Sequence, residues 1–346
     1  MARITVNGIS LNVEVAGAGP PLLLLHGFTG SAATWASHLP ELSSRATTIA
    51  VDLIGHGASD APADPARYTM SHCIADLLAV LDRLEIGRAA VLGYSMGARV
   101  ALHLALAAPE RVVGLVLESG SPGLAGESER SARRASDEEL AATIERDGVR
   151  AFVVRWEQLP LFASQSTLPA EVRSALRRQR LRNSAQGLAH SLRGMGTGAQ
   201  ASLWSRLGQI DIPALLIVGA LDEKFCRIGR AMAAAMPRAR LAVVPGAGHA
   251  VHLERPDEFN RLVVGFTDAC DDSAFGVWRS GCPQERAEGR KANAERRLHE
   301  GDTHDGSTMA NGPRVHGHQV REGGRHREGD DQSSRGAQCL PPQDSV

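Results

Sequence analysis

The feature that most constrains this chain is the pentapeptide Gly-Tyr-Ser-Met-Gly at 93–97, which stands between two different sequence patterns. Before it, 89–92 is a short continuous apolar run, typical of a buried parallel strand. After it, 98–107 is rich in alanine and leucine and predicts a helix. A strand that becomes a helix within so few residues needs glycine on both sides of the turn, because a Cβ there would clash. The pattern therefore predicts a sharp turn that holds the hydroxyl of Ser95 at a sheet edge and a helix N-terminus.

Similar apolar runs recur along the first 270 residues and alternate with helical patterns. This alternation predicts an α/β fold with a mostly parallel sheet, whose chemistry lies at the carboxyl ends of the strands. A β-hairpin is expected first, because two short alternating runs are separated by Asn7-Gly8. The predicted strands are 4–6, 11–15, 22–25, 47–51, 89–92, 112–117, 214–218 and 241–244, and the predicted core helices are 70–85 and 96–107.

One stretch of the chain interrupts this alternation and has no strand signal. It predicts a helical cap (121–205) inserted between two parts of the core, 1–120 and 206–270. Within the cap, amphipathic and arginine-rich patterns predict helices at about 131–148 and 170–193.

Composition excludes several classes of protein. The net charge of −1 gives no field for gripping nucleic acid or an anionic membrane. The five cysteines are scattered without a C-x-x-C pair, which argues against a disulfide framework or a zinc site. No signal peptide opens the chain, and no apolar run is long enough to span a membrane. We therefore expect a cytoplasmic protein without an integral membrane segment.

A serine nucleophile or base needs a histidine, and the histidine needs an acid to orient it. Asp222 follows the predicted strand 214–218, and His249 follows the last predicted strand. The order Ser95, Asp222, His249 is the one expected for a serine on this kind of turn. The backbone N–H groups of Met96 and Phe28 would then form an oxyanion hole.

Three further histidines have simpler interpretations. His26 is expected to be structural, His56 to be a turn residue, and His252 to be a neighbour of His249 and not the base.

Taken together, these residues resemble the α/β-hydrolase superfamily across 1–270. This turn alone leaves esterase, lipase, amidase, C–C hydrolase and lyase activities open. Further strings resemble the family of 2-succinyl-6-hydroxy-2,4-cyclohexadiene-1-carboxylate synthases of menaquinone biosynthesis. They lie at 93–99, 121–124, 130–137, 156–162, 180–183 and 222–225, in both the core and the predicted cap.

This resemblance implies a lyase, with no metal and no organic cofactor. The family eliminates pyruvate from 2-succinyl-5-enolpyruvyl-6-hydroxy-3-cyclohexene-1-carboxylate, a small polycarboxylate substrate, with the triad serine as the base. Arginines suit such a substrate because their planar forks bind carboxylates in pairs of hydrogen bonds. The resemblance implies that the substrate-binding residues are Tyr94, Arg99, Arg133, Trp156 and Arg180.

Two other functions remain open from the sequence. The first is a serine hydrolase, either an esterase or a C–C hydrolase, that acts on a small acidic substrate. The second is a non-catalytic receptor on the same fold, against which the complete set of serine, aspartate and histidine argues.

The last part of the chain, 271–346, has only nine large apolar residues and no periodic pattern. Such a segment buries too little apolar surface to offset its ordering entropy, which predicts disorder. A second hypothesis is translation in the wrong frame across a neighbouring gene. Codons chosen for 324–346 and read in another frame can encode a string that resembles the start of 1,4-dihydroxy-2-naphthoyl-CoA synthase.

Overall fold

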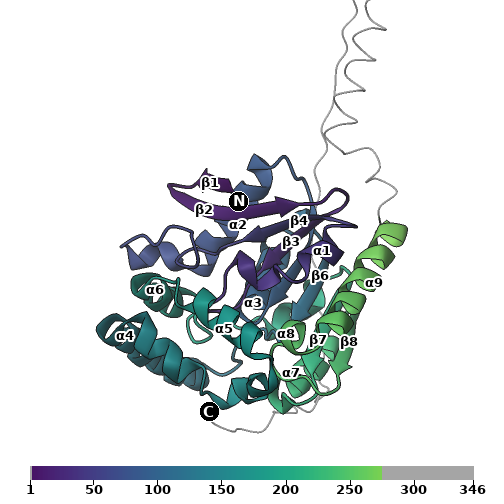
Figure 1. Cartoon of the computed structure of the whole chain (residues 1–346). Helices are drawn as coiled ribbons and strands as arrows, with labels where there is room; N and C mark the ends of the chain where they lie inside the picture. Colours follow the sequence, from purple (N-terminus) through teal and green to yellow (C-terminus); the bar gives the residue numbers. More distant parts are fainter. Residues whose placement is uncertain (1, 275–346) are drawn as a thin grey trace, which may run out of the picture. The chain divides into compact units, whose positions relative to one another are not determined.

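A computed structural model describes residues 2–274, in which eight strands form one sheet of order β1-β2-β4-β3-β5-β6-β7-β8 (Figure 1). The first hairpin is antiparallel and joins β4 in antiparallel pairing, and the remaining neighbours are all parallel. The prediction of an α/β-hydrolase fold with a mostly parallel sheet is confirmed. The strands are β1 (Ala2–Val6), β2 (Ile9–Ala16), β3 (Pro21–Leu25), β4 (Thr47–Val51), β5 (Ala89–Tyr94), β6 (Val112–Glu118), β7 (Ala214–Gly219) and β8 (Ala239–Val244).

Both faces of the central strands are buried, which explains their continuous apolar runs. Leu23 and Leu25 of β3 belong to one core cluster, which also contains residues of α2 and α3. Leu22 and Leu24 point to the opposite face, in the cluster that contains Phe259 of α9. The core helices are α1 (Leu39–Leu42), α2 (Met70–Arg83), α3 (Met96–Ala107), α7 (Glu223–Ala235), α8 (Val251–Glu254) and α9 (Pro256–Ala274); short 3₁₀ turns are η1 (Ala32–Trp35), η2 (Pro65–Tyr68), η3 (Pro109–Arg111), η4 (Pro160–Thr167) and η5 (Trp204–Gln209).

Three helices lie between β6 and β7: α4 (Glu127–Trp156), α5 (Ala170–Arg180) and α6 (Ala185–Met195). They group beside the sheet in Figure 1, and we refer to them as the cap helices. The helix α4 is kinked at Gly148, whose φ of +79° is not helical. Beyond the kink, Phe152 and Val153 pack with residues of α6 in a separate apolar cluster.

The prediction of one helix over 170–193 is wrong, because the chain breaks between α5 and α6. Ser184 is the N-cap of α6, and its side chain accepts a hydrogen bond from the backbone N–H of Gly187. Serine is favoured at such a position because its oxygen satisfies an otherwise free N–H of the first helical turn. The amphipathic pattern continues across the break, so periodicity alone does not reveal it.

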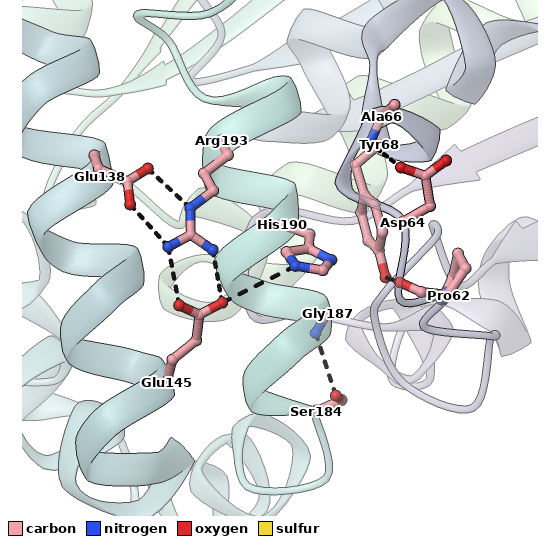
Figure 2. A network of polar contacts seen from close by, with 10 residues as sticks. All are labelled: Pro62, Asp64, Ala66, Tyr68, Glu138, Glu145, Ser184, Gly187, His190 and Arg193. Carbon is pink, nitrogen blue, oxygen red and sulfur yellow. Dashed lines mark hydrogen bonds and ion pairs between the residues drawn. The ribbon is translucent and has the colours of Figure 1, made fainter.

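Two of the cap helices are joined by Arg193 of α6, which binds Glu138 and Glu145 of α4 (Figure 2). On the same helix, the ring of His190 meets the ring of Tyr68 at a centroid distance of 5.1 Å. Tyr68 belongs to η2 of the core and is fully buried. These contacts fasten α6 both to α4 and to the core.

Within residues 2–274, no helix is long and apolar enough to cross a bilayer. The expectations of disorder or a shifted reading frame for 271–346 fall, from residue 275 onward, outside the described residues.

Candidate active site

Ser95 lies at the junction of β5 and α3, with φ of 51° and ψ of −104°. A non-glycine residue with positive φ is strained, and such strain is typical of a nucleophile elbow. The backbone N–H of Ser95 donates to the carbonyl of Glu118 at 2.8 Å, which anchors the turn to β6. A Cβ at Gly93 would overlap the backbone of Gly97, and a Cβ at Gly97 would overlap the carbonyl of Leu25. Glycine is therefore required at both positions.

The side chains of Ser95, His249 and Asp222 form a continuous hydrogen-bonded line. His249 Nε2 lies 3.1 Å from Ser95 Oγ, and His249 Nδ1 lies 2.8 Å from Asp222 Oδ2. A carboxylate can only accept a hydrogen bond, so it holds the ring proton on Nδ1 and leaves Nε2 free to accept the serine proton. The other oxygen, Asp222 Oδ1, accepts from the backbone N–H of Phe225 at 3.1 Å and caps α7.

The loop that contains Phe28 lies against the elbow. A Cβ on Gly27 would be 2.7 Å from the ring of Tyr94 and 3.5 Å from Ser95 Cβ. Among the described residues, the N–H groups of Phe28 and Met96 have no hydrogen-bond acceptor. Both are therefore free to donate to a bound oxygen atom, which is one requirement of an oxyanion hole.

Arg99 lies one turn into α3 and its guanidinium reaches the end of α6. It donates to the carbonyl of Met195 at 2.6 Å and to Gln200 Oε1 at 2.5 Å, both of which are neutral acceptors. Desolvation, followed by the charge of Arg133, lowers the pKa of Arg99 to about 10. Arg133 itself is more exposed and pairs with Asp137 on its own helix at 2.7 Å. A bound carboxylate would relieve the unfavourable burial of the Arg99 charge.

Arg180 is the last residue of α5 and its side chain is only 6% exposed. It makes two long hydrogen bonds, to Glu157 at 3.2 Å and to Gln165 at 3.3 Å. Its Nε is buried and has no partner among the described residues, and burial lowers its pKa. The guanidinium also lies over the ring of Phe162. Arg180 is therefore a buried cation with unused hydrogen-bonding capacity, at the wall of a surface groove of about 730 Å³.

Aromatic rings pack against one another between the cap and the triad. The Trp156 ring meets Phe28 edge-on at 5.4 Å and Phe162 at 5.5 Å, and Phe162 meets His249 at 6.3 Å. Trp156 Nε1 is buried and has no acceptor in the described part of the chain. Tyr94 lies 5.6 Å from the ring of His249, and burial raises its pKa well above the ordinary value. Aromatic surface and unpartnered N–H groups of Trp156 and Arg180 thus lie near the triad, and small-molecule sites commonly combine these two features.

His26 and His56 are buried in the loops beside this site. Burial lowers the pKa of His26 to about 4 and that of His56 to about 3, so both are neutral near pH 7. The ring of His26 accepts from the backbone N–H of Leu53 at 3.0 Å and bonds the carbonyl of Gly27 at 2.8 Å. These contacts position the loops, and neither ring reaches Ser95.

Sequence reasoning missed a buried pair behind the elbow. His252 Nδ1 lies 2.9 Å from both carboxylate oxygens of Glu118, and both side chains are fully buried. The ring of His252 meets Tyr94 edge-on at 4.6 Å. The available signal was a glutamate at the end of an otherwise apolar strand. No group of three or more His, Cys, Asp or Glu side chains within residues 2–274 is arranged to hold a metal ion.

Comparison with known proteins places this geometry in a family. The α/β hydrolase fold family matches residues 20–256. A Bacillus subtilis (strain 168) protein assigned as a 2-succinyl-6-hydroxy-2,4-cyclohexadiene-1-carboxylate synthase is 46% identical over 268 residues, covering 76% of this chain and 97% of that protein. The synthase of Serratia proteamaculans is 35% identical over 244 residues, covering 69% of this chain and 90% of its own length. The structure of MenH from S. aureus is 34% identical with a TM-score of 0.72, covering 75% of this chain and 98% of that one. The chain therefore belongs to the α/β-hydrolase fold family and, within it, to the 2-succinyl-6-hydroxy-2,4-cyclohexadiene-1-carboxylate synthases.

Proposed function

We propose that this protein is a carbon–oxygen lyase of menaquinone biosynthesis. It converts 2-succinyl-5-enolpyruvyl-6-hydroxy-3-cyclohexene-1-carboxylate into 2-succinyl-6-hydroxy-2,4-cyclohexadiene-1-carboxylate and pyruvate. The observation that carries the proposal is the aligned Ser95–His249–Asp222 line together with the buried Arg180, whose Nε has no partner among the described residues. The names of the relatives support the same reaction.

In this reaction Ser95 acts as a base and forms no covalent bond to the substrate. Its hydroxyl proton passes to His249 Nε2, and its oxygen removes the ring proton beside the succinyl ketone. The electron pair of that C–H bond shifts through the ring double bond and breaks the C–O bond to the enolpyruvyl group. His249 then gives its proton to the departing enolpyruvate, which becomes pyruvate, and Ser95 keeps the proton taken from the ring.

Negative charge develops on the ketone oxygen when the ring proton leaves. The free N–H groups of Met96 and Phe28 are proposed to bind that oxygen and to stabilise the transition state. Removal of one such donor from an oxyanion hole typically lowers kcat by about 10²–10³-fold.

The substrate carboxylates are proposed to bind the arginines of the site. Arg180 is buried and its Nε has no partner among the described residues, while Arg99 is partly buried and its hydrogen-bond partners are neutral. Arg133 lies near Arg99 and is proposed to share a carboxylate with it. Trp156 and Tyr94 would supply polar tips and apolar walls. Because the substrate and product are charged and water-soluble, we propose a cytoplasmic enzyme. The proposed elimination needs only proton transfers by Ser95 and His249, so we propose that it uses no metal or organic cofactor.

A second candidate function is hydrolysis of a small acidic ester or C–C substrate. The 3.1 Å separation of Ser95 Oγ and His249 Nε2 also suits attack of the serine on a carbonyl carbon. The product distinguishes the two reactions, because elimination releases pyruvate without consuming water.

The test is a pyruvate assay on the full chain. Purified protein is mixed with the enolpyruvyl precursor, and pyruvate is measured by coupling to lactate dehydrogenase and NADH. We expect release of one pyruvate per precursor and loss of that release in Ser95→Ala. Full release by Ser95→Ala, or no release by the wild type, would contradict the proposal.

A further inference from the structure

The turn Gly27–Gly30, which presents Phe28, is held in a strained conformation. The N–H of Gly30 donates to the carbonyl of Gly27 at 2.9 Å, and Thr29, the third residue of the turn, has φ of +69°. A β-turn with positive φ at this position normally carries glycine there. For a β-branched residue, this conformation costs about 1–3 kcal/mol, and it persists only where the surroundings enforce it.

The group that holds this turn comes from the cap. Asn183 lies in the break between α5 and α6 and is buried. Its Nδ2 donates to the carbonyl of Thr29 at 2.8 Å, and its Oδ1 accepts from the N–H of Gly57 at 2.9 Å. The second hydrogen of Nδ2 reaches the carbonyl of Arg180 at 3.1 Å. The amide therefore uses both donors and its oxygen, and this bonding fixes its orientation.

We propose that Asn183 is a positioning residue for the oxyanion hole. It touches neither substrate nor Ser95, and it acts by holding Thr29 at positive φ. Without it, Thr29 relaxes to negative φ, the turn Gly27–Gly30 changes shape, and the N–H of Phe28 is displaced from its place beside the elbow. This inference rests on the role proposed for Phe28, and it makes the oxyanion hole of the core depend on a residue of the cap.

The experiment measures covalent labelling of Ser95 in the full chain by a fluorophosphonate probe. Ser95 Oγ attacks phosphorus, fluoride leaves, and the phosphoryl oxygen occupies the oxyanion hole, so the rate reports the hole without the natural substrate. We expect Asn183→Ala to slow labelling and pyruvate kcat by about 10- to 100-fold, because small misplacements of catalytic groups have effects of this size. The KM for the precursor should change little, because the arginines remain.

Two further variants separate positioning from folding. Asn183→Asp keeps the acceptor for Gly57 but places a carboxylate against the Thr29 carbonyl, so it should be as slow as Asn183→Ala. The double variant Asn183→Ala with Thr29→Gly should recover most of the labelling rate, since glycine adopts positive φ without strain. Ser184→Ala, an exposed neighbour that caps α6, is the matched control and should label at the wild-type rate.

The outcomes are distinct. Wild-type labelling by Asn183→Asp, or no recovery in a folded double variant, would overturn the inference. If Asn183→Ala does not fold, Asn183→Asp and the double variant decide the question. If the wild type labels but releases no pyruvate, the proposed reaction fails while the positioning role of Asn183 is still measured.

Discussion

Asp222 performs two tasks that an asparagine cannot perform together. Oδ2 accepts from His249 Nδ1 at 2.8 Å, and Oδ1 accepts from the N–H of Phe225 at 3.1 Å. A carboxylate has an acceptor on each side, whereas an amide has an acceptor on one side and a donor on the other. In Asp222→Asn, one of the two hydrogen bonds must therefore be lost or reversed.

Which bond is lost follows from the energies. Turning the NH₂ group toward the Phe225 N–H would remove the helix cap at a cost of about 1 kcal/mol and would also oppose two donors. Turning it toward His249 requires only that the ring proton move from Nδ1 to Nε2. We expect the second arrangement, in which Nε2–H faces Ser95 and cannot accept its proton. A wrong tautomer of this kind lowers kcat by about 10⁴-fold in a serine protease triad.

The assay compares Asp222→Asn with Asp222→Ala. Both should lower pyruvate release by about 10³–10⁴-fold. Only the alanine variant should also lose the cap, which lowers Tm by about 2–4 °C for each kcal/mol in a domain of this size. Nitrogen-15 NMR of the histidine side chains should show the proton of His249 on Nε2 in Asp222→Asn. Retention of more than a tenth of wild-type kcat by that variant would refute the role given to the aspartate.

Three further perturbations follow from the same structure. Arg180→Lys should raise the KM for the precursor by about 10- to 100-fold, because hydrogen bonds to charged groups contribute about 1.5–3 kcal/mol. The control Arg178→Lys, at an exposed position, should keep a KM near that of the wild type, and equal KM values for the two variants would contradict a carboxylate bound at Arg180. Gly97→Ala should lower Tm or abolish folding, because the added Cβ would overlap a carbonyl of β3. An unchanged Tm in calorimetry would argue against this close approach of α3 to β3. Burial holds the pKa of His56 at about 3, against about 6.5 when unfolded, so stability is full above pH 6.5 and falls as pH decreases. Urea titrations from pH 7 to pH 4 should show that the free energy of unfolding falls less steeply with pH in His56→Gln than in the wild type, by about 1.4 kcal/mol per pH unit. The same slope in both proteins would contradict a buried neutral ring.

The strands and the elbow were predictable because local patterns determine them. A two-sided apolar run reports burial on both faces of a sheet, and paired glycines report a turn with no room for a Cβ. The predicted range 47–51 coincides with β4, and 96–107 coincides with α3.

What could not be predicted depends on residues that meet only in the folded chain. The break after α5 was missed because its amphipathic pattern continues, while Asn183 bonds to Thr29 and Gly57, which lie far away in sequence. The pairing of Glu118 with His252 was missed for the same reason, since no spacing rule links the end of one strand to a short helix after another.

The arginines of this site have one further consequence, for the speed of substrate capture. Two groups of charges, one of which includes Arg99 of α3, each contain one more arginine than carboxylates, so each keeps a net positive charge before substrate arrives. A polyanion is drawn toward such a site during diffusion, and dissolved salt weakens that attraction. The whole chain has a net charge of only −1, so the attraction is local to these two groups. The rate of encounter, and with it kcat/KM, should fall steeply as ionic strength rises, while kcat stays nearly constant. The two groups are Arg99, Arg133 and Asp137, and Arg177, Arg180 and Glu157.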